Sequence, residues 1–287
     1  MKEYKEKILV ETGYSGANVS CIRTNRGLVL IDSPFLPNDA RNWARAIVQR
    51  TGSEIAYQIN TDHHFDHVLG NSFLTDKVIC HQAAARGIKY LEDKEKLLAI
   101  VRDTFPDLGP DVEAEFLKVR IAPAEISFEK SLTLELGDVT LRLEFVGGHS
   151  PGTILVQFVE TNTIFTGDNV EEYFPYFGQS RFFVWKDLLK RLASLDIDLV
   201  VPGHGEVGGK ELVKRYLEFF DTLEHEVKEF AIKGRQVDEM LRDSEVIGFF
   251  SLEKMMEQGM SKAWVEAQYK TAAEQIISES RSHSSRL

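Results

Sequence analysis

The chain has 287 residues, of which 43% are hydrophobic, and it carries a formal net charge of -11. This size suffices for one large domain with an appendage or for two modest domains. The negative charge argues against a nucleic-acid partner, because phosphate binding needs clustered Lys and Arg. No apolar run is long enough for a signal peptide or a spanning helix, so we expect a cytoplasmic protein with no membrane partner. Cys21 and Cys80 lie in apolar stretches, which favours buried thiols over a disulfide.

The first half of the chain begins with a predicted hairpin. Residues 17–33 contain two apolar runs on either side of a polar turn that includes a glycine. A helix is predicted next over residues 38–52, with Asn38 as its N-cap. The apolar stretch 54–60 is then predicted as a strand that leads directly into a polar, histidine-rich segment.

The same order of elements recurs in the second half. A hairpin is predicted over residues 153–168, a helix over 185–195 and a strand over 198–205. Each half closes its hairpin with an aspartate, Asp32 in the first and Asp168 in the second. Two β-β-α-β halves favour two sheets packed face to face with helices outside, which is a four-layer αββα sandwich of the α/β class.

Two further segments stand outside this repeat. Residues of about 82–120 are charged and mostly helical in pattern, and we interpret them as an insertion that is a candidate lid. The alternating residues 131–146 predict strands that return the chain to the sheet. We therefore divide the chain into a sandwich domain, residues 1–209, and a C-terminal helical extension, residues 210–287. The extension is either an added helical layer or the contact of a homodimer.

Side chains that commonly bind metal ions follow four of the predicted strands directly. Loops at the ends of strands carry polar groups beside a rigid scaffold, and loops at one sheet edge converge in space. Five of the eight histidines lie in these loops, which favours a shared metal centre over isolated structural histidines. The candidate metal ligands are Asp62, His64, Asp66, His67, His149, Asp168 and His204.

The order of these motifs resembles that of the metallo-β-lactamase superfamily. The family's His-x-His-x-Asp-His motif is matched by residues 62–67, with Asp62 where the family has its first histidine. The resemblance covers residues from about 15 to 210 and implies the metallo-β-lactamase fold. The family's later ligands, a His, a bridging Asp and a last His, correspond to His149, Asp168 and His204.

The resemblance implies two divalent metal ions, for which zinc is favoured. The aspartate at position 62 adds negative charge to the first site, which makes manganese or iron alternatives to zinc. A second register, in which His63 replaces Asp62 as the ligand, stays open. The first ion would be held by Asp62, His64 and His149, the second by Asp66, His67 and His204, and Asp168 would bridge the two.

Two ions of this kind imply a hydrolase. Ions about 3.5–4 Å apart activate a bridging water as the nucleophile, and we expect Asp66 to orient that hydroxide and to carry protons. The expected substrate is a small ester, lactone, thioester or amide, with β-lactam cleavage as a side activity. The carboxylate-rich first site keeps a second hypothesis open, a non-haem iron oxygenase or sulfur dioxygenase. A third is a binding or scaffold protein that dimerises through the C-terminal helices and has lost activity, which failure to retain metal would indicate.

Three further features have two interpretations each. The segment 169–185 is rich in Tyr and Phe, and together with Phe35 and Phe65 it either walls an apolar substrate pocket or packs beneath helices. Arg181 either holds a substrate carboxylate or forms an exposed salt bridge. Asp32 is either a turn residue or an acceptor that orients a metal-binding histidine.

Overall fold

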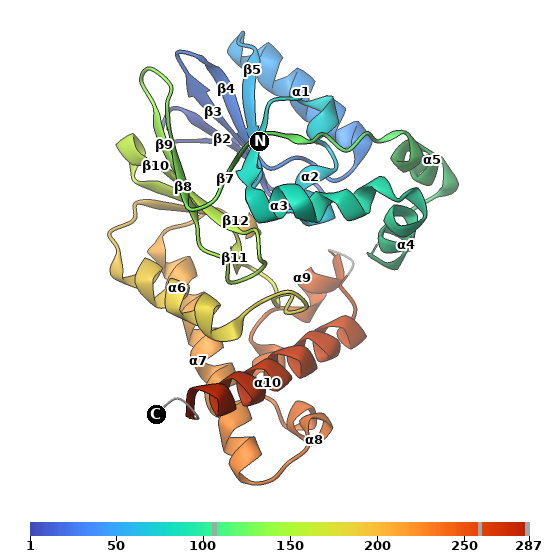
Figure 1. Cartoon of the computed structure of the whole chain (residues 1–287), viewed down its shortest axis with the longest axis vertical. Coiled ribbons are helices and arrows are strands. Elements are labelled where there is room, and N and C mark those ends of the chain that lie inside the picture. Colours follow the sequence, from blue (N-terminus) through green and yellow to red (C-terminus); the bar gives the residue numbers. More distant parts are fainter. Residues whose placement is uncertain (105–107, 258–259, 285–287) are drawn as a thin grey trace.

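The computed structural model describes residues 1–104, 108–257 and 260–284. Within these ranges the chain forms two mixed β-sheets with helices on their outer sides, and further helices follow at the C-terminal end (Figure 1). The predicted αββα sandwich with a helical extension is confirmed. No helix in the ranges given combines the length and the apolar character that a membrane crossing requires.

The first sheet has the order β1-β2-β3-β4-β5-β6-β7, antiparallel from β1 to β4 and parallel from β4 to β7. Its β3 and β4 form the hairpin predicted over residues 17–33. The two strands before them were not predicted, because runs of three and four residues are too short to show a clear period. The strands are β1 (Lys2–Tyr4), β2 (Ile8–Glu11), β3 (Val19–Thr24), β4 (Gly27–Ile31), β5 (Ile55–Ile59), β6 (Val78–His81) and β7 (Ala124–Phe128).

The second sheet has the order β12-β11-β10-β9-β8, and only its β11 and β12 pair in parallel. An antiparallel hairpin followed by a helix and a parallel strand therefore occurs in both halves, as the repeated pattern predicts. The strands are β8 (Ser131–Glu135), β9 (Thr140–Phe145), β10 (Ile154–Phe158), β11 (Thr163–Glu171) and β12 (Leu199–His204).

The facing sides of the two sheets form a shared hydrophobic core. Successive side chains of a strand point to opposite faces, so Leu141 and Leu143 of β9 are buried while Arg142 and Glu144 are exposed. This shared core fixes the strands of one sheet relative to those of the other, and so it also fixes the loops that follow them. The core residues from the two sheets include Ile8, Val10, Ile22, Val29, Ile59, Ile154, Val156 and Phe165.

Helix α1 (Pro37–Thr51) covers the outer face of the first sheet, where it buries Trp43 and Ile47. The predicted helix is confirmed, but Asn38 is not its N-cap. Leu36 occupies that position without a side-chain cap, and Pro37 begins the helix. Proline suits this position because its missing N–H would have no partner in the first turn.

The predicted insertion connects β6 to its parallel neighbour β7, and its helical pattern is confirmed. Its helices pack with α2 around Phe35 and Phe116, so they form a small cluster beside the loops that follow β4 and β5. Movement of this segment as a lid stays a prediction. The helices of the insertion are α3 (Gln82–Gly87), a 3-10 helix over Ile88–Glu92, α4 (Lys94–Thr104) and α5 (Pro110–Lys118). Helix α2 (Phe65–Val68) and a 3-10 helix over Asn71–Phe73 lie before β6.

The C-terminal helices lie together on the side of the second sheet, next to α6 (Phe182–Ser194) (Figure 1). Residues of α6, α7 and α10 share one hydrophobic cluster with Leu155 and Val200 of the sheet. The extension is thus an added helical layer, and a homodimer contact stays a prediction. The helices are α7 (Lys210–Ile232), α8 (Val237–Arg242), α9 (Leu252–Glu257) and α10 (Lys262–Ser284), with a 3-10 helix over Val246–Gly248.

Candidate metal centre

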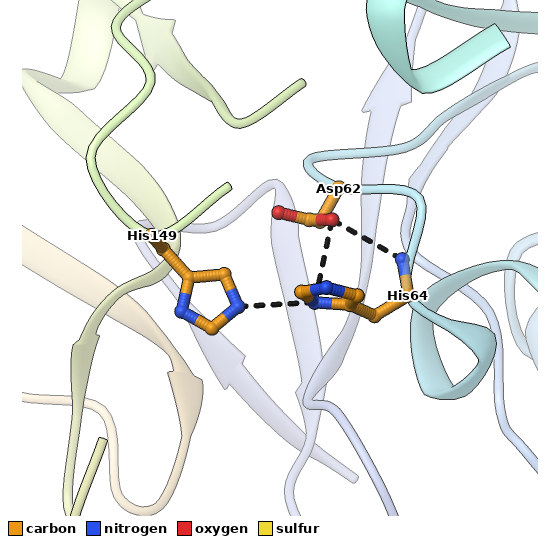
Figure 2. Close-up of side chains that lie close together, drawn as sticks. All are labelled: Asp62, His64 and His149. Carbon is orange, nitrogen blue, oxygen red and sulfur yellow. Dashed lines mark hydrogen bonds and ion pairs between the residues drawn. The ribbon is translucent and has the colours of Figure 1, made fainter. Parts of the chain in front are cut away.

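Loops and strand ends from both sheets meet at one edge of the sandwich. Asp62 and His64 follow β5 of the first sheet, and His149 lies in the turn between β9 and β10 of the second (Figure 2). Asp168 lies in β11, and His204 ends its parallel neighbour β12. Residues distant in the sequence therefore meet because most of them follow or end a strand of the packed sheets, while Asp168 lies inside β11 where its pairing with β12 shifts register.

The first group of candidate ligands consists of Asp62, His64 and His149, whose ligand atoms lie within 4.8 Å of one another. The Nδ1 atom of His64 lies 3.0 Å from the Nε2 atom of His149, and 3.5 Å from Oδ1 of Asp62 (Figure 2). Two imidazole nitrogens at this distance either share a proton or face a common cation.

The second group consists of Asp66, His67 and His204, again with ligand atoms within 4.8 Å. Oδ2 of Asp66 lies 3.3 Å from Nε2 of His204 and 4.0 Å from Nε2 of His67. All three side chains belong to the predicted set, and they converge as the second site requires.

Asp168 lies between the two groups. Its Oδ2 atom is 3.1 Å from Nε2 of His67 and 3.4 Å from Nε2 of His149. Its Oδ1 atom is 3.4 Å from Nε2 of His204. One carboxylate thus contacts imidazoles of both groups, which is the arrangement predicted for a bridging ligand.

The carboxylates in and beside the second group favour positive charge at this position. Burial opposes the charged form of His67, but the carboxylates of Asp168 and Asp32 raise its pKa well above the usual value. Burial likewise opposes charge on His204, and Asp168 and Asp66 raise its pKa. Burial also opposes charge on Asp168, whose pKa is nevertheless held well below its usual range by His67 and His204. Protons or a metal cation at this position would meet the same electrostatic need.

The donor atoms fit divalent metal ions. Imidazole nitrogen and carboxylate oxygen are the ligands that zinc, manganese and iron accept. Burial lowers the pKa of His149 to about 4, so this imidazole is neutral at physiological pH, as a metal ligand must be. Oδ1 of Asp168 is buried and accepts no hydrogen bond from the described part of the chain. The set of residues therefore fits a metal pair.

Asp32 orients His67. Oδ2 of Asp32 lies 2.9 Å from Nδ1 of His67, on the opposite side of the ring from Asp168. Thr61 holds the same carboxylate, because its N–H and its hydroxyl donate to the two Asp32 oxygens at 2.8 and 2.6 Å. Of the two interpretations of Asp32, the contact supports the orienting acceptor.

Close backbone contacts position the two histidines of the second sheet. Asn18 donates through Nδ2 to the carbonyl groups of Pro202 and Gly205, on either side of His204. A Cβ atom at Gly203 would lie 2.0 Å from Oδ1 of Asp168, so only glycine allows this approach. The backbone of His149 is held by Asn169, whose Oδ1 accepts a hydrogen bond from the His149 N–H at 3.1 Å.

Asp62 is the most extensively hydrogen-bonded of the candidate ligands. Its Oδ2 accepts from the hydroxyl groups of Ser150 at 2.7 Å and Thr153 at 2.5 Å. Its Oδ1 accepts from the backbone N–H groups of His63 and His64. Although burial opposes charge on Asp62, His64 and His63 hold its pKa well below the usual range. Because both oxygens are already engaged, Asp62 can offer a cation only a weak bond.

The alternative ligand His63 lies outside both groups. Its Nε2 atom is 3.1 Å from Oε1 of Gln179, and its Nδ1 atom is 3.0 Å from Oδ1 of Asp62. The structure therefore brings Asp62, and not His63, together with His64 and His149.

Glu171 is a further acidic residue beside the centre, and it was not predicted from the sequence. Together with His149 and Asp168 it forms a third group whose ligand atoms lie within 4.8 Å. The hydroxyl of Tyr216, from α7, lies 3.4 Å from Oε1 of Glu171. Burial and the nearby Asp168 raise the pKa of Glu171 well above its usual value. Glu171 lies within a fully buried strand and follows no recognisable motif, so the sequence contained no signal for it.

The aromatic segment 169–185 divides between the two roles considered for it. Phe174 and Phe177 are fully buried in the hydrophobic cluster beneath the helices. Tyr173 and Tyr176 are only partly buried and lie beside the candidate ligands, with Tyr173 6.3 Å from His204 between ring centroids. Phe35 belongs to a core cluster, and partly buried Phe65 packs against it at a centroid distance of 5.3 Å.

Arg181 is exposed and forms the N-cap of α6. Its backbone N–H donates to the carbonyl of Gly148 at 2.9 Å, which ties α6 to the turn that carries His149. Its exposed side chain forms no salt bridge with another described residue, and a role in holding a substrate carboxylate stays a prediction.

The fold and the two ligand groups define a metallo-β-lactamase-type protein. The sequence of residues 12–204, which include all seven candidate ligands, matches the family model of the metallo-beta-lactamase superfamily. The chain belongs to this superfamily.

Two named relatives and several solved structures are similar to the chain. The acyl-coenzyme A thioesterase MBLAC2 of Homo sapiens is 26% identical over 197 residues, which cover 61% of this chain and 66% of that protein. The Bos taurus protein of the same name matches equally. The chain thus spans just under two thirds of the length of these relatives.

The solved structures show the same fold at low sequence identity. A metallo-beta-lactamase from Pontibacter korlensis has a TM-score of 0.61 and 18% identity, and the match covers 77% of this chain and 97% of that one. The stereoselective inverting sec-alkylsulfatase Pisa1 from Pseudomonas sp. has a TM-score of 0.74 and 16% identity. That match covers 94% of this chain and 49% of the sulfatase chain. The wider coverage in the second match means that most of the C-terminal layer also has a structural counterpart.

Proposed function

We propose that this protein is a binuclear metallohydrolase that cleaves a small ester, lactone, thioester or amide, and that thioesters are its main substrates. The observation that carries the proposal is the position of Asp168, which lies within 3.4 Å of imidazole nitrogens from both ligand groups. A carboxylate shared between two groups of donors is the arrangement that a pair of ions needs.

In this proposal, Asp62, His64 and His149 hold the first ion and Asp66, His67 and His204 hold the second. Asp168 is shared between them. Zinc is the favoured metal, with manganese or iron as alternatives. Two bound ions would supply a nucleophile from water near neutral pH and would polarise the carbonyl group of the substrate.

Asp66 is the residue that we assign to proton transfer. Its side chain is 16% exposed, compared with 7% for Asp168 and 0% for Asp62. It is therefore the most solvent-accessible of these three carboxylates, which favours it for proton exchange with solvent during turnover. A positioned carboxylate of this kind can orient a water molecule and accept its proton.

The surroundings of the centre support an acyl substrate. The ring of Tyr173 lies beside His204, and that of Tyr176 lies beside His64, so aromatic side chains flank both ligand groups. Such rings offer apolar surface to an acyl chain and a hydroxyl group for its polar end. The thioesterase name of the human relative favours thioesters among the four substrate classes.

A substrate screen on zinc-loaded protein tests the proposal. The panel would contain acyl-coenzyme A and acyl-glutathione thioesters, aryl esters, lactones, β-lactams and phosphodiesters. We expect the highest kcat/KM for a thioester, and loss of activity when a chelator removes the metal. Protein that holds two ions and hydrolyses no thioester would contradict the substrate assignment.

One observation keeps a redox function as the second candidate. Asp62 in the first group and Glu171 beside Asp168 make the centre richer in carboxylates than a histidine-based zinc site. Carboxylate oxygens favour iron or manganese relative to zinc. Iron in the freshly purified protein, together with substrate-dependent oxygen consumption, would support a non-haem iron oxygenase or sulfur dioxygenase instead of a hydrolase.

A further inference from the structure

Residues 172–181, here called the aromatic loop, join β11 to α6 and form part of the wall of the candidate metal centre. The ring of Tyr176 stands nearly perpendicular to that of His64, with 5.5 Å between centroids. It lies 6.1 Å from the ring of His149. Tyr176 therefore borders the first ligand group, and a substrate bound there would meet its ring.

The other side of the aromatic loop is held by α10, a helix about ninety residues further along the chain. The backbone N–H of Phe177 donates to Oε1 of Gln268 at 2.8 Å. Nε2 of Gln275 donates to the carbonyl oxygen of Phe177 at 2.8 Å, and Oε1 of Gln275 accepts from the hydroxyl of Ser180 at 3.0 Å. The backbone N–H and the backbone carbonyl of Phe177 are thus both bound by side chains of α10.

The spacing of the two glutamines explains how one helix binds both backbone groups of Phe177. Gln268 and Gln275 are seven residues apart, which is close to two turns, so they lie on the same face of α10. Phe177 is fully buried, and its backbone groups need partners although the loop has no regular secondary structure around it. Gln268 supplies the acceptor for the Phe177 N–H, and Gln275 donates to the Phe177 carbonyl beside the backbone N–H of Ser180, which donates to it at 3.2 Å.

We propose that Gln268 and Gln275 are positioning residues that fix Tyr176 beside the first ligand group, and that Tyr176 limits the size of the acyl group that binds there. Tyr176 immediately precedes Phe177, so holding the Phe177 backbone sets the direction of the tyrosine ring. The C-terminal helical layer is then part of the substrate site. This inference deepens the proposed function and rests on it for its kinetic consequences.

Gly178 offers an independent way to move the same ring. A Cβ atom at Gly178 would lie 2.2 Å from the hydroxyl oxygen of Tyr176 and 2.3 Å from Cζ. The exposed Gly178 has no positive φ angle, so alanine there is compatible with the backbone. Gly178→Ala must therefore displace the ring of Tyr176 while α10 and its glutamines stay unchanged.

Hydrogen exchange tests the positioning role without any assay of activity. Gln268→Met removes the acceptor of the Phe177 N–H, whereas Gln268→Glu keeps an acceptor oxygen at the same place. We expect amide exchange in the aromatic loop to become about tenfold faster in Gln268→Met, and to stay near the wild-type rate in Gln268→Glu. Unchanged exchange in Gln268→Met, or equal acceleration in both variants, would overturn the positioning role.

Kinetics on short-chain and long-chain acyl thioesters test the size limit. The ratio of kcat/KM between the two substrates should shift about tenfold toward the long chain in Gln268→Met, and it should also change in Gly178→Ala, with metal content unchanged in both variants. Tyr176→Phe keeps the ring and should keep the wild-type ratio. An equal loss for both substrates would overturn the inference, and Gly178→Ala decides this even if Gln268→Met does not fold. Wild-type protein that cleaves no thioester would instead contradict the proposed function, and the exchange experiment would still decide the role of α10.

Discussion

His67 lies between two carboxylates, with Oδ2 of Asp32 2.9 Å from its Nδ1 atom and Oδ2 of Asp168 3.1 Å from its Nε2 atom. Asp32 adopts this position at a φ angle of +56°, in the left-handed region that few residues other than glycine occupy. A strained conformation that also makes a buried contact with a candidate ligand indicates a functional constraint on this turn.

Asp32→Asn should weaken metal binding while the fold is kept. Asparagine tolerates the left-handed conformation, but its neutral amide holds the Nδ1–H of His67 less strongly. We expect the affinity for metal to fall by about 10- to 100-fold, measured by competition with a chromogenic chelator. Asp187→Asn is the control, since that side chain is 74% exposed on α6 and loses the same charge. Equal affinities in both variants would show that Asp32 has no orienting role.

Asp66→Ala should reduce turnover far more than it reduces binding of the first ion. Asp66 belongs to the second group and is the most exposed of the carboxylates assigned to the two ions. Loss of a positioned acid–base group lowers kcat by about 10²- to 10⁴-fold. Steady-state kinetics beside elemental analysis of the same sample measure the two effects. Unimpaired turnover in Asp66→Ala would remove this residue from the reaction.

The candidate ligands could be predicted from the sequence because each follows an apolar run that is easy to recognise, although β11 continues past its apolar run to include Asp168. His149 lies in a turn and His204 ends β12, and both belong to the sheet that carries Asp168. The bridging role of Asp168 was predicted from the family resemblance and stays a prediction, with its carboxylate within 3.4 Å of imidazole nitrogens from both groups.

Other features could not be predicted because they depend on tertiary contacts. Glu171 lies inside a buried strand, and its partner Tyr216 belongs to α7. The contacts of Gln268 and Gln275 with the aromatic loop join segments more than ninety residues apart. Local sequence patterns report periodicity and turns, and they contain no record of which helix face meets which loop.

The C-terminal layer should contribute strongly to stability. Ile276 of α10 is fully buried in the cluster shared with α6 and the second sheet. Ile276→Ala should lower the free energy of unfolding by about 2–4 kcal/mol, because it leaves a cavity. Ile232 of α7 is 82% exposed, so Ile232→Ala should change stability by less than about 0.5 kcal/mol. Urea unfolding compares the two, and similar values would contradict the packing of α10.

The two cysteines should be unreactive in the folded protein. Burial raises the pKa of Cys21 and of Cys80 to about 12. The thiolate is the reactive form, so at about pH 8 both groups stay protonated and inert, and reactivity requires unfolding or a far higher pH. A disulfide-exchange reagent should detect neither thiol in the native protein and both in denaturant. Rapid reaction of either thiol at about pH 8 would contradict the buried positions.

The central claim is that seven side chains bind two metal ions, and metal stoichiometry tests it most directly. Native mass spectrometry of zinc-loaded protein should show two ions per chain in the wild type and one in each of His149→Ala and His204→Ala. Because both oxygens of Asp62 already accept hydrogen bonds, the ion of the first group should leave first in a chelator titration, and His149→Ala should lack that early phase. Wild-type protein that retains at most one ion, or variants that still hold two, would contradict the account.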